Sequence, residues 1–437
     1  MKYLNKSISI KNYILIINIA IPMIIANLST PLLGLVDTAI VGRISIEQIG
    51  SIAIGSTILS FVYFCFGFFR MGTTGLVAQA WGKKDLKEIE RILFNNLILA
   101  LFVSFLCIII IILLHEFILL LFTNDEIIKN YSSNYLLIRI FEAPAKFINF
   151  IILGLLLGCN KPWQVFKLVI FVNLLNIILD IILGVFLKYE LSGIAFGTLI
   201  AEYCCLVLGI FITYKEFEYL QIIKNKIELK KLKNIFHSNL NLFVRTLLIL
   251  ISIMMFTAIG SRLGPLTLAA NAILISIQMF ISYGLDGFAQ AAEVLVGNNY
   301  EKHKKNNLIN IIIISGIISF ITALLISIIL LLFGNHIVNI ISPIKEVINE
   351  ADKFIIFIIF SPIISFLSFH MDGVFIGANL TKIMRNSVFM SFIIYLILIL
   401  LLVPYYGNYG LWISFMIFLF FRGILLVINL RKVFNII

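Results

Sequence analysis

The stretch Leu97–Leu114 reads LILALFVSFLCIIIIILL and holds no charged residue. A helix needs roughly 20 consecutive apolar residues to cross the hydrocarbon core of a bilayer. Blocks of the same character recur at Ile311–Leu332 and Phe389–Val403. Soluble domains carry roughly 25% charged residues, whereas this chain of 437 residues carries 13% and is 61% apolar. The sequence therefore predicts an all-α integral membrane protein, because side chains that face lipid need no polar cover.

The apolar blocks divide the chain into twelve predicted spans. Most loop lysines and arginines lie at the N-terminus, in every second connection and in the C-terminal tail. Since positively charged loops stay in the cytoplasm, we expect both termini there, with the chain in the inner membrane of a bacterial cell. The basic residues of the cytoplasmic loops then account for the formal charge of +11, and we expect no nucleic acid as a partner. The predicted spans are roughly residues 13–41, 49–80, 88–114, 131–158, 162–187, 192–214, 236–260, 267–297, 306–333, 349–378, 382–403 and 409–430.

The chain also repeats itself at one fixed offset. Thr38-Ala39-Ile40 recurs as Thr257-Ala258-Ile259. The same offset relates Arg43 to Arg262, Gly154 to Gly373, Gly158 to Gly377 and Asn160 to Asn379. Two halves of six spans each enter the membrane with the same orientation, which predicts a parallel repeat. We expect an N-terminal six-helix lobe over residues 1–214, a cytoplasmic linker over 215–235 and a C-terminal six-helix lobe over 236–437.

Ionisable residues inside a span are expensive, so each is a candidate functional residue. The candidates are Asp37, Arg70, Arg139, Glu142, Lys146, Asp180, Glu202, Arg245, Asp286, Glu293, Asp372 and Arg422. The five cysteines show no metal-ligand spacing, and no His-Glu metal motif, nucleophile elbow or phosphate loop is present. We therefore expect neither an enzyme nor a metal centre, and no cofactor beyond a coupling ion, H⁺ or Na⁺.

The strongest candidate is Asp180, which continues a polar stripe with Asn173 and Asn176 on an otherwise apolar helix. A stripe of this kind would be costly against lipid, so it should face a cavity or another polar helix. Asp37 and Thr198 fall at a similar depth of the same lobe. A buried carboxylate can bind a proton or a metal cation, so we predict Asp37 and Asp180 as the cation-coupling pair, with Na⁺ as the alternative ion.

Supporting residues follow from helical spacing. Thr30 shares a face with Asp37, and Glu202 lies one turn from Thr198. We predict that Asn176, Thr198, Thr30 and Glu202 support the site. Arg139, Glu142 and Lys146 have the spacing to pair along their own helix. Pro22 removes a backbone hydrogen bond from the first span and is predicted to kink it.

Two longer strings resemble a known family. Leu32–Gly42 reads LLGLVDTAIVG and Arg70–Ala80 reads RMGTTGLVAQA. They resemble the first and second spans of multidrug and toxic compound extrusion (MATE) transporters of the DinF-like branch, and the likeness extends over nearly the whole chain. The strings at Asp286–Ala289 and Asp372–Gly377 are similar to that branch as well.

The resemblance implies a V-shaped, two-lobed antiporter that exchanges a cation for an exported compound. It implies that Asp37 and Asp180 are the coupling acids, beside Asn176 and Thr198, and that Pro22 is the bending proline. Other branches use a glutamate in the seventh span for sodium, but no acid lies between Phe236 and Gly260 here. Proton coupling is therefore favoured over sodium coupling.

A gate between the lobes is predicted on the cytoplasmic side. Arg70 lies in the inner half of an inward-running span that has no acid of its own. Asp286, Glu293 and Asp372 fall in the inner halves of inward-running spans of the second lobe. A buried arginine needs a partner, so we predict an ion pair between Arg70 and one of these acids.

We expect a monomer surrounded by membrane lipid that exports amphiphilic organic cations. One alternative is a lipid or oligosaccharide flippase of the same superfamily. From another class, a channel or an integral-membrane enzyme remains open. A major-facilitator transporter would show a Gly-Asp-Arg-Arg pattern in the second connection, which instead reads Trp81-Gly82-Lys83-Lys84-Asp85.

Overall fold

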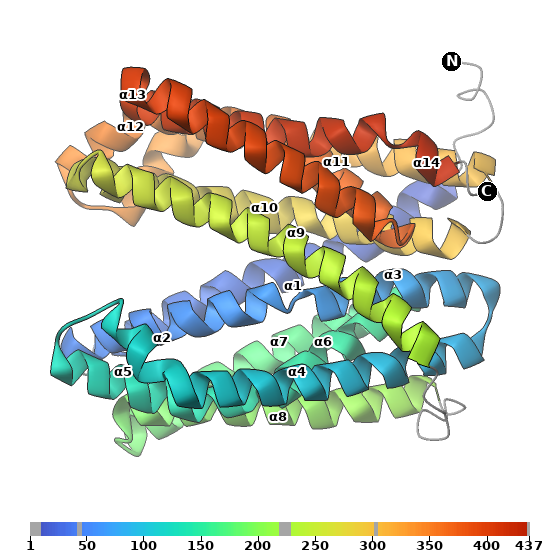
Figure 1. Cartoon of the computed structure of the whole chain (residues 1–437), viewed down its shortest axis with the longest axis horizontal. Helices are drawn as coiled ribbons and strands as arrows, with labels where there is room; N and C mark the ends of the chain where they lie inside the picture. The colour runs from blue at the N-terminus through green and yellow to red at the C-terminus, as the bar shows by residue number, and fades with distance from the viewer. Residues whose placement is uncertain (1–9, 42–45, 218–228, 301–304, 435–437) are drawn as a thin grey trace. The chain divides into compact units, whose positions relative to one another are not determined.

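The computed structural model describes residues 10–41, 46–217, 229–300 and 305–434, and this part of the chain is helical with no β-strand (Figure 1). The helices are α1 (Ile10–Val41), α2 (Ile46–Cys65), α3 (Phe68–Lys83), α4 (Leu86–Leu120), α5 (Glu126–Arg139), η1 (Ile140–Glu142), α6 (Ala143–Gly158), α7 (Pro162–Leu179), η2 (Asp180–Phe186), α8 (Glu190–Glu216), α9 (Leu229–Arg262), α10 (Pro265–Tyr300), α11 (Lys305–Ile341), α12 (Lys345–Gly377), α13 (Thr381–Ile428) and α14 (Arg431–Phe434).

Eleven helical runs among the described residues are long and apolar enough to cross a membrane. The last of them contains α13, whose 48 residues would measure about 72 Å as one helix. That is more than twice the roughly 30 Å thickness of a hydrocarbon core. Gly407 interrupts α13 with φ 53° and ψ −128°, a left-handed conformation that glycine adopts readily. The run therefore holds two spans, so the described residues form the twelve spans predicted for this membrane protein.

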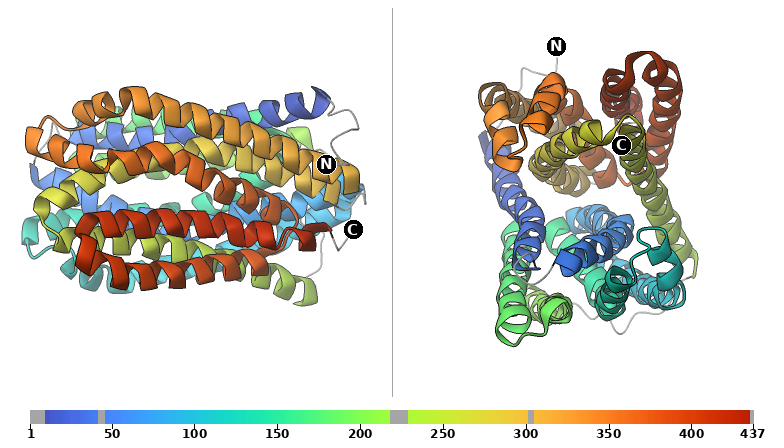
Figure 2. Two further views of the ribbon diagram at one scale, coloured as in Figure 1. Left: turned by 90° about the horizontal axis from the view of Figure 1, so that it is seen from above. Right: turned by 90° about the vertical axis from the view of Figure 1, so that its left-hand side faces the viewer.

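The chain forms two compact units that divide within α1 and α9. The N-terminal unit comprises Ile25–Asn239, and the C-terminal unit comprises Met1–Ile24 with Leu240–Ile437. Within each unit the helices run lengthwise beside one another (Figure 2). Helices α8 and α9 extend into both ends of the predicted linker, because α8 continues to Glu216 and α9 begins at Leu229. The lobe boundaries themselves stay a prediction.

Close helix pairs that depend on glycine occur at equivalent positions of the two units. In the N-terminal unit, a Cβ at Gly154 of α6 would lie 2.8 Å from the main-chain oxygen of Arg70 in α3. In the C-terminal unit, a Cβ at the equivalent Gly373 of α12 would overlap the main-chain oxygen of Ala289 in α10. Small residues let membrane helices approach to backbone contact. The sequence repeat therefore corresponds to a repeated helix pairing in the fold.

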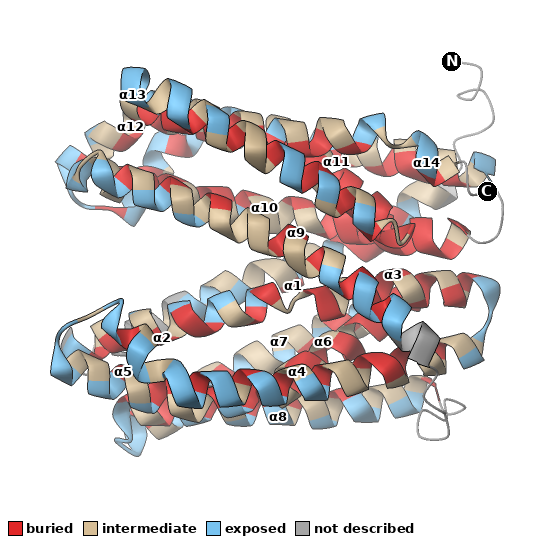
Figure 3. Ribbon diagram, in the orientation of Figure 1, coloured by how far each residue is buried: buried red, intermediate tan, exposed pale blue. Residues whose placement is uncertain are grey.

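Burial follows the pattern of helices packed in lipid. From Leu101 onward, most exposed residues of α4 are large apolar side chains such as Phe102, Phe105 and Leu113 (Figure 3). The buried residues of the same helix include small and polar ones, such as Asn96, Ala100 and Ser104, beside isoleucines and leucines. This distribution fits a lipid environment, because polar groups must find partners inside the bundle.

Candidate functional site

Asp180 is completely buried in the N-terminal unit, at the point where α7 changes into the wider π-helical segment η2. A π-helical turn interrupts the regular hydrogen-bond ladder and is frequent at functional sites. Helix α8 comes so close here that a Cβ on Gly197 would overlap Asp180 Oδ1. The carboxylate is therefore held between its own distorted turn and the glycine surface of α8.

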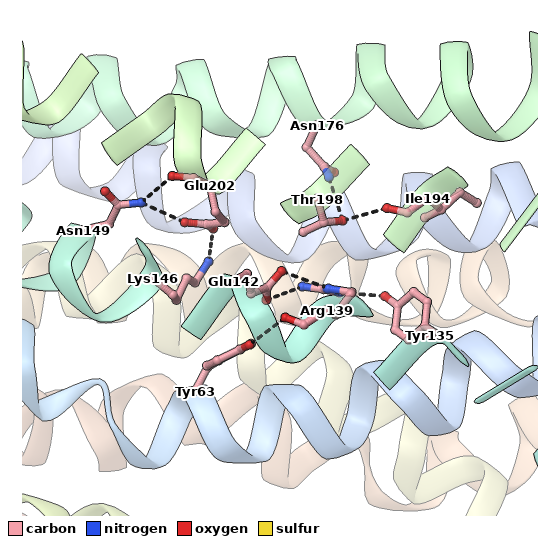
Figure 4. Close-up of polar contacts among 10 residues, drawn as sticks. All are labelled: Tyr63, Tyr135, Arg139, Glu142, Lys146, Asn149, Asn176, Ile194, Thr198 and Glu202. Atoms are coloured by element: carbon pink, nitrogen blue, oxygen red, sulfur yellow. Dashed lines mark hydrogen bonds and ion pairs between the residues drawn. The ribbon is translucent and has the colours of Figure 1, made fainter. Parts of the chain in front are cut away.

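The polar stripe predicted from the sequence faces neighbouring helices and not lipid. Asn176 donates from Nδ2 to Thr198 Oγ1 over 2.8 Å, and the Thr198 hydroxyl donates to the main-chain oxygen of Ile194 over 3.2 Å (Figure 4). Asn173 donates to Ser29 Oγ of α1 over 2.7 Å. The structure thus brings α1, α7 and α8 together around the residues next to Asp180.

Three residues of α1 were predicted to take part in the site or to kink the helix: Asp37, Thr30 and Pro22. Asp37 lies on α1, but its side chain falls outside the described residues, so its role stays a prediction. Pro22 is buried. Thr30 is exposed, and the adjacent Ser29 makes the contact to α7 instead. Spacing counted from Asp37 selected Thr30, whereas the hydrogen bond to Asn173 is made by the side chain next to it.

Glu202 does not join the hydrogen bonds of Thr198 but belongs to a separate set of buried charges. Lys146 contacts Glu202, and Asn149 donates to Glu202 Oε2 over 2.9 Å and to its main-chain oxygen over 3.0 Å (Figure 4). Arg139 binds Glu142 through two nitrogens, at 3.1 and 2.7 Å. The predicted pairing along one helix is therefore confirmed for Arg139 and Glu142, whereas Lys146 reaches across to α8. We call Arg139, Glu142, Lys146 and Glu202 the N-unit charge quartet.

The C-terminal unit holds its own buried charges. Arg245 of α9 and Arg422 of α13 both donate to Asp372 Oδ2 of α12, and Arg422 does so over 2.8 Å. All three side chains are at least nine-tenths buried. Arg422 also lies over the rings of Phe369 and Phe418, at 5.7 and 6.0 Å, a position that aromatic rings stabilise. Asp372 therefore already holds two cationic partners from its own unit.

The other predicted gate residues lie on α10, which carries Asp286 and Glu293, and on α3, which carries Arg70. Asp286 is half-buried on α10, close enough to Arg422 to attract it electrostatically. Glu293 is buried about two helical turns further along α10. Arg70 is half-buried on α3. A pair between Arg70 and an acid of the C-terminal unit stays a prediction. Of the three acids, Asp372 already has two arginine partners, and these would compete with Arg70 for its carboxylate.

Sequence reasoning missed Gly197, Asn149 and Ser29. The spacing Gly193-x-x-x-Gly197 was a usable signal, since small residues four apart mark close helix contacts in membranes. A Cβ on Gly193 would lie 2.6 Å from the main-chain carbonyl of Leu183 in η2. Asn149 and Ser29 carried no such pattern, because a single polar residue on a helix does not reveal which neighbour it meets.

Comparison with known proteins agrees with this architecture. The MatE family model matches the chain twice, over residues 22–182 and 242–401, once in each half. The chain is 33% identical over 419 residues to "DNA damage-inducible protein F" of Escherichia coli K12, covering 95% of this chain and 91% of that protein. It is 22% identical over 373 residues to human "Multidrug and toxin extrusion protein 1", covering 83% of this chain and 64% of that protein.

A solved structure described as the outward-facing conformation of a multidrug resistance MATE family transporter superimposes with a TM-score of 0.87. Its identity is 17%, with 96% of each chain covered, so it supports the fold. The twofold family match and the full-length bacterial relative establish the affiliation. The chain is a member of the MatE family, the multidrug and toxic compound extrusion transporters, in the DinF-like branch.

Proposed function

We propose that the chain is a secondary antiporter of the bacterial inner membrane, with both termini cytoplasmic, that exports amphiphilic organic cations in exchange for protons. Asp37 and Asp180 carry the coupling proton, and Asn176 and Thr198 position the second of these acids. The family affiliation and the relatives named for multidrug and toxin extrusion support export of drug-like compounds.

The observation that carries the proposal is the complete burial of Asp180 inside a membrane helix. An ionised carboxylate in such a place costs several kcal/mol unless it is compensated. Binding a proton removes that cost, so proton binding stabilises one arrangement of the helices around η2 and proton loss stabilises another. A carboxylate enclosed in this way can therefore convert a proton gradient into a change of helix packing.

Sodium is the competing ion, and the N-terminal unit alone does not distinguish it, since carboxylate, amide and hydroxyl oxygens all bind hard cations. We favour protons because no acid lies between Phe236 and Gly260, and because Asp372 of the C-terminal unit is already paired with Arg245 and Arg422. A sodium ion there would have to displace an arginine.

The test is efflux of a fluorescent organic cation from proteoliposomes under one gradient at a time. An imposed proton gradient without sodium should drive efflux in the wild-type chain, and Asp37→Asn and Asp180→Asn should each abolish it at matched protein content. Efflux driven by a sodium gradient at equal pH, with no response to the proton gradient, would reverse the ion assignment. Full activity of both variants would end the assignment of the two acids.

A further inference from the structure

The N-unit charge quartet contains two ion pairs of unequal enclosure. Arg139 and Glu142 are 12% and 0% exposed and are joined through two nitrogens. Arg139 is also held by the Tyr135 hydroxyl at 2.6 Å and lies over the Tyr135 ring. Lys146 is 28% exposed and contacts Glu202 through a single nitrogen. The pair between Lys146 and Glu202 is therefore the one that can open, because one of its members reaches the surface of the unit.

Glu202 would stay in place if Lys146 left it. Asn149 holds the carboxylate through Oε2 and the backbone through the main-chain oxygen of the same residue. Lys146 would also have a second partner, because Glu142 lies four residues before it and is the other carboxylate that attracts its ammonium group. Lys146 therefore interacts with two carboxylates: it contacts Glu202, and it is attracted by Glu142, which Arg139 binds as well.

We propose that Glu202 binds the cationic head group of the exported compound, and that Lys146 occupies this carboxylate as a tethered internal cation when no compound is bound. This inference rests on the proposed export of organic cations. When the compound replaces Lys146 at Glu202, the carboxylate keeps a cationic partner in both states, so neither state leaves it as an isolated buried ion. Because Lys146 contributes a single charge, the site takes a monovalent head group and disfavours a divalent one.

One aromatic side chain lies beside the quartet. The Tyr63 hydroxyl donates to the main-chain oxygen of Arg139 over 3.3 Å (Figure 4), and the Tyr63 ring meets Phe147 edge-on at 6.0 Å. Aromatic faces stabilise organic cations that are stripped of water, so we expect the site to prefer quaternary ammonium or phosphonium compounds to hydrated metal ions.

The position of Glu202 also links it to the coupling site. Thr198 and Glu202 share one face of α8, four residues or about 6 Å of helix rise apart. Thr198 is bonded to Asn176 beside Asp180. A cation at Glu202 and a proton at Asp180 therefore add positive charge to neighbouring parts of the same bundle. Their mutual repulsion in a low-dielectric interior disfavours simultaneous binding, which is the condition for exchange.

The experiment is equilibrium binding of tetraphenylphosphonium to the purified full chain in phosphatidylcholine nanodiscs at low salt. Lys146→Met vacates Glu202 and should raise the affinity about tenfold or more, whereas Glu202→Gln should lower it at least about tenfold, a change of roughly 1.4 kcal/mol. The matched control is Lys161→Met, which removes the lysine of another Lys–Glu pair on α8, Lys161–Glu216 at 2.7 Å. This control should bind as the wild type does.

Lys146→Met/Glu202→Gln removes both charges together and leaves no unpaired ion, so it keeps the test decisive if Lys146→Met alone fails to fold. It should bind as weakly as Glu202→Gln. The inference is overturned if the double variant and Glu202→Gln both bind as tightly as the wild type, or if Lys161→Met raises the affinity as much as Lys146→Met. Those results leave the proposed function intact, whereas absence of cation efflux in proteoliposomes overturns the proposed function itself.

Discussion

Gly197 leaves no room for a side chain beside the candidate coupling carboxylate, so Gly197→Ala perturbs the site without altering any charge. A Cβ there would overlap Asp180 Oδ1 and lie 3.2 Å from the main-chain nitrogen of Asp180. To reach ordinary van der Waals contact, the carboxylate must move by about 1 Å or α8 must move away from η2.

The cost to stability should be modest. Overpacking by a methyl group costs about 1–3 kcal/mol, and replacing glycine by alanine inside a helix returns about 0.5–1 kcal/mol. The net loss is therefore about 0–2.5 kcal/mol, and we expect the protein to stay folded. Coupling should suffer more, because a functional site tolerates displacements of only about 0.5 Å, and we expect proton-driven efflux to fall at least about tenfold.

The assay is proton-driven efflux from proteoliposomes, with thermal unfolding of the same preparation as the stability measurement. Gly209→Ala is the matched control on the same helix, because its Cβ would meet only apolar side-chain atoms, those of Ile152 at 3.2 and 3.3 Å and of Leu168 at 3.8 Å. Wild-type efflux by Gly197→Ala, or an equal loss in Gly209→Ala, would refute the view that close packing of α8 positions Asp180.

Three further predictions concern other parts of the chain. Asp372→Asn should lower the free energy of unfolding by about 3–5 kcal/mol, because Arg245 and Arg422 would lose their shared buried partner. The control is Glu350→Gln, which breaks the pair with the exposed Lys353 and should cost under about 1 kcal/mol in the same unfolding measurement. Pro22→Ala restores a backbone donor to α1, so efflux should fall while the folded yield is kept, and unchanged efflux would make Pro22 purely architectural. Arg70→Asp and Asp286→Arg should each impair efflux and the double swap should restore part of it; a double variant no better than either single, with swaps at Glu293 and Asp372 failing as well, would eliminate the predicted gate.

The sequence was sufficient to predict the helices and the main polar stripe. Apolar blocks of membrane length fix the spans, and Asn173, Asn176 and Asp180 stand out because polar residues are costly in lipid. The repeat was readable too, since Gly154 and Gly373 recur at one offset and make equivalent close contacts. Each of these features can be read from one segment of sequence, or from two segments compared with each other. None requires knowing which helices are neighbours in space.

Partner choice was not predictable, because it depends on which helices become neighbours and how far each is rotated. Lys146 had an acid at helical spacing in Glu142, yet it contacts Glu202 of α8. Arg245 and Arg422 were recognisable as buried charges, but their convergence on Asp372 requires α9, α12 and α13 to be placed in space. The π-helical turn at Asp180 was equally hidden, since it results from packing against α8 and has no signature in residue spacing.

The most direct test of proton coupling through Asp180 is proton release triggered by an organic cation, measured with a pH-sensitive dye in a weakly buffered suspension of the purified protein. Tetraphenylphosphonium should release protons from the wild-type chain, and Asp180→Asn should abolish this release while the variant still binds the cation. Equal proton release from the wild type and Asp180→Asn would contradict the assignment of Asp180 as a proton-coupling residue.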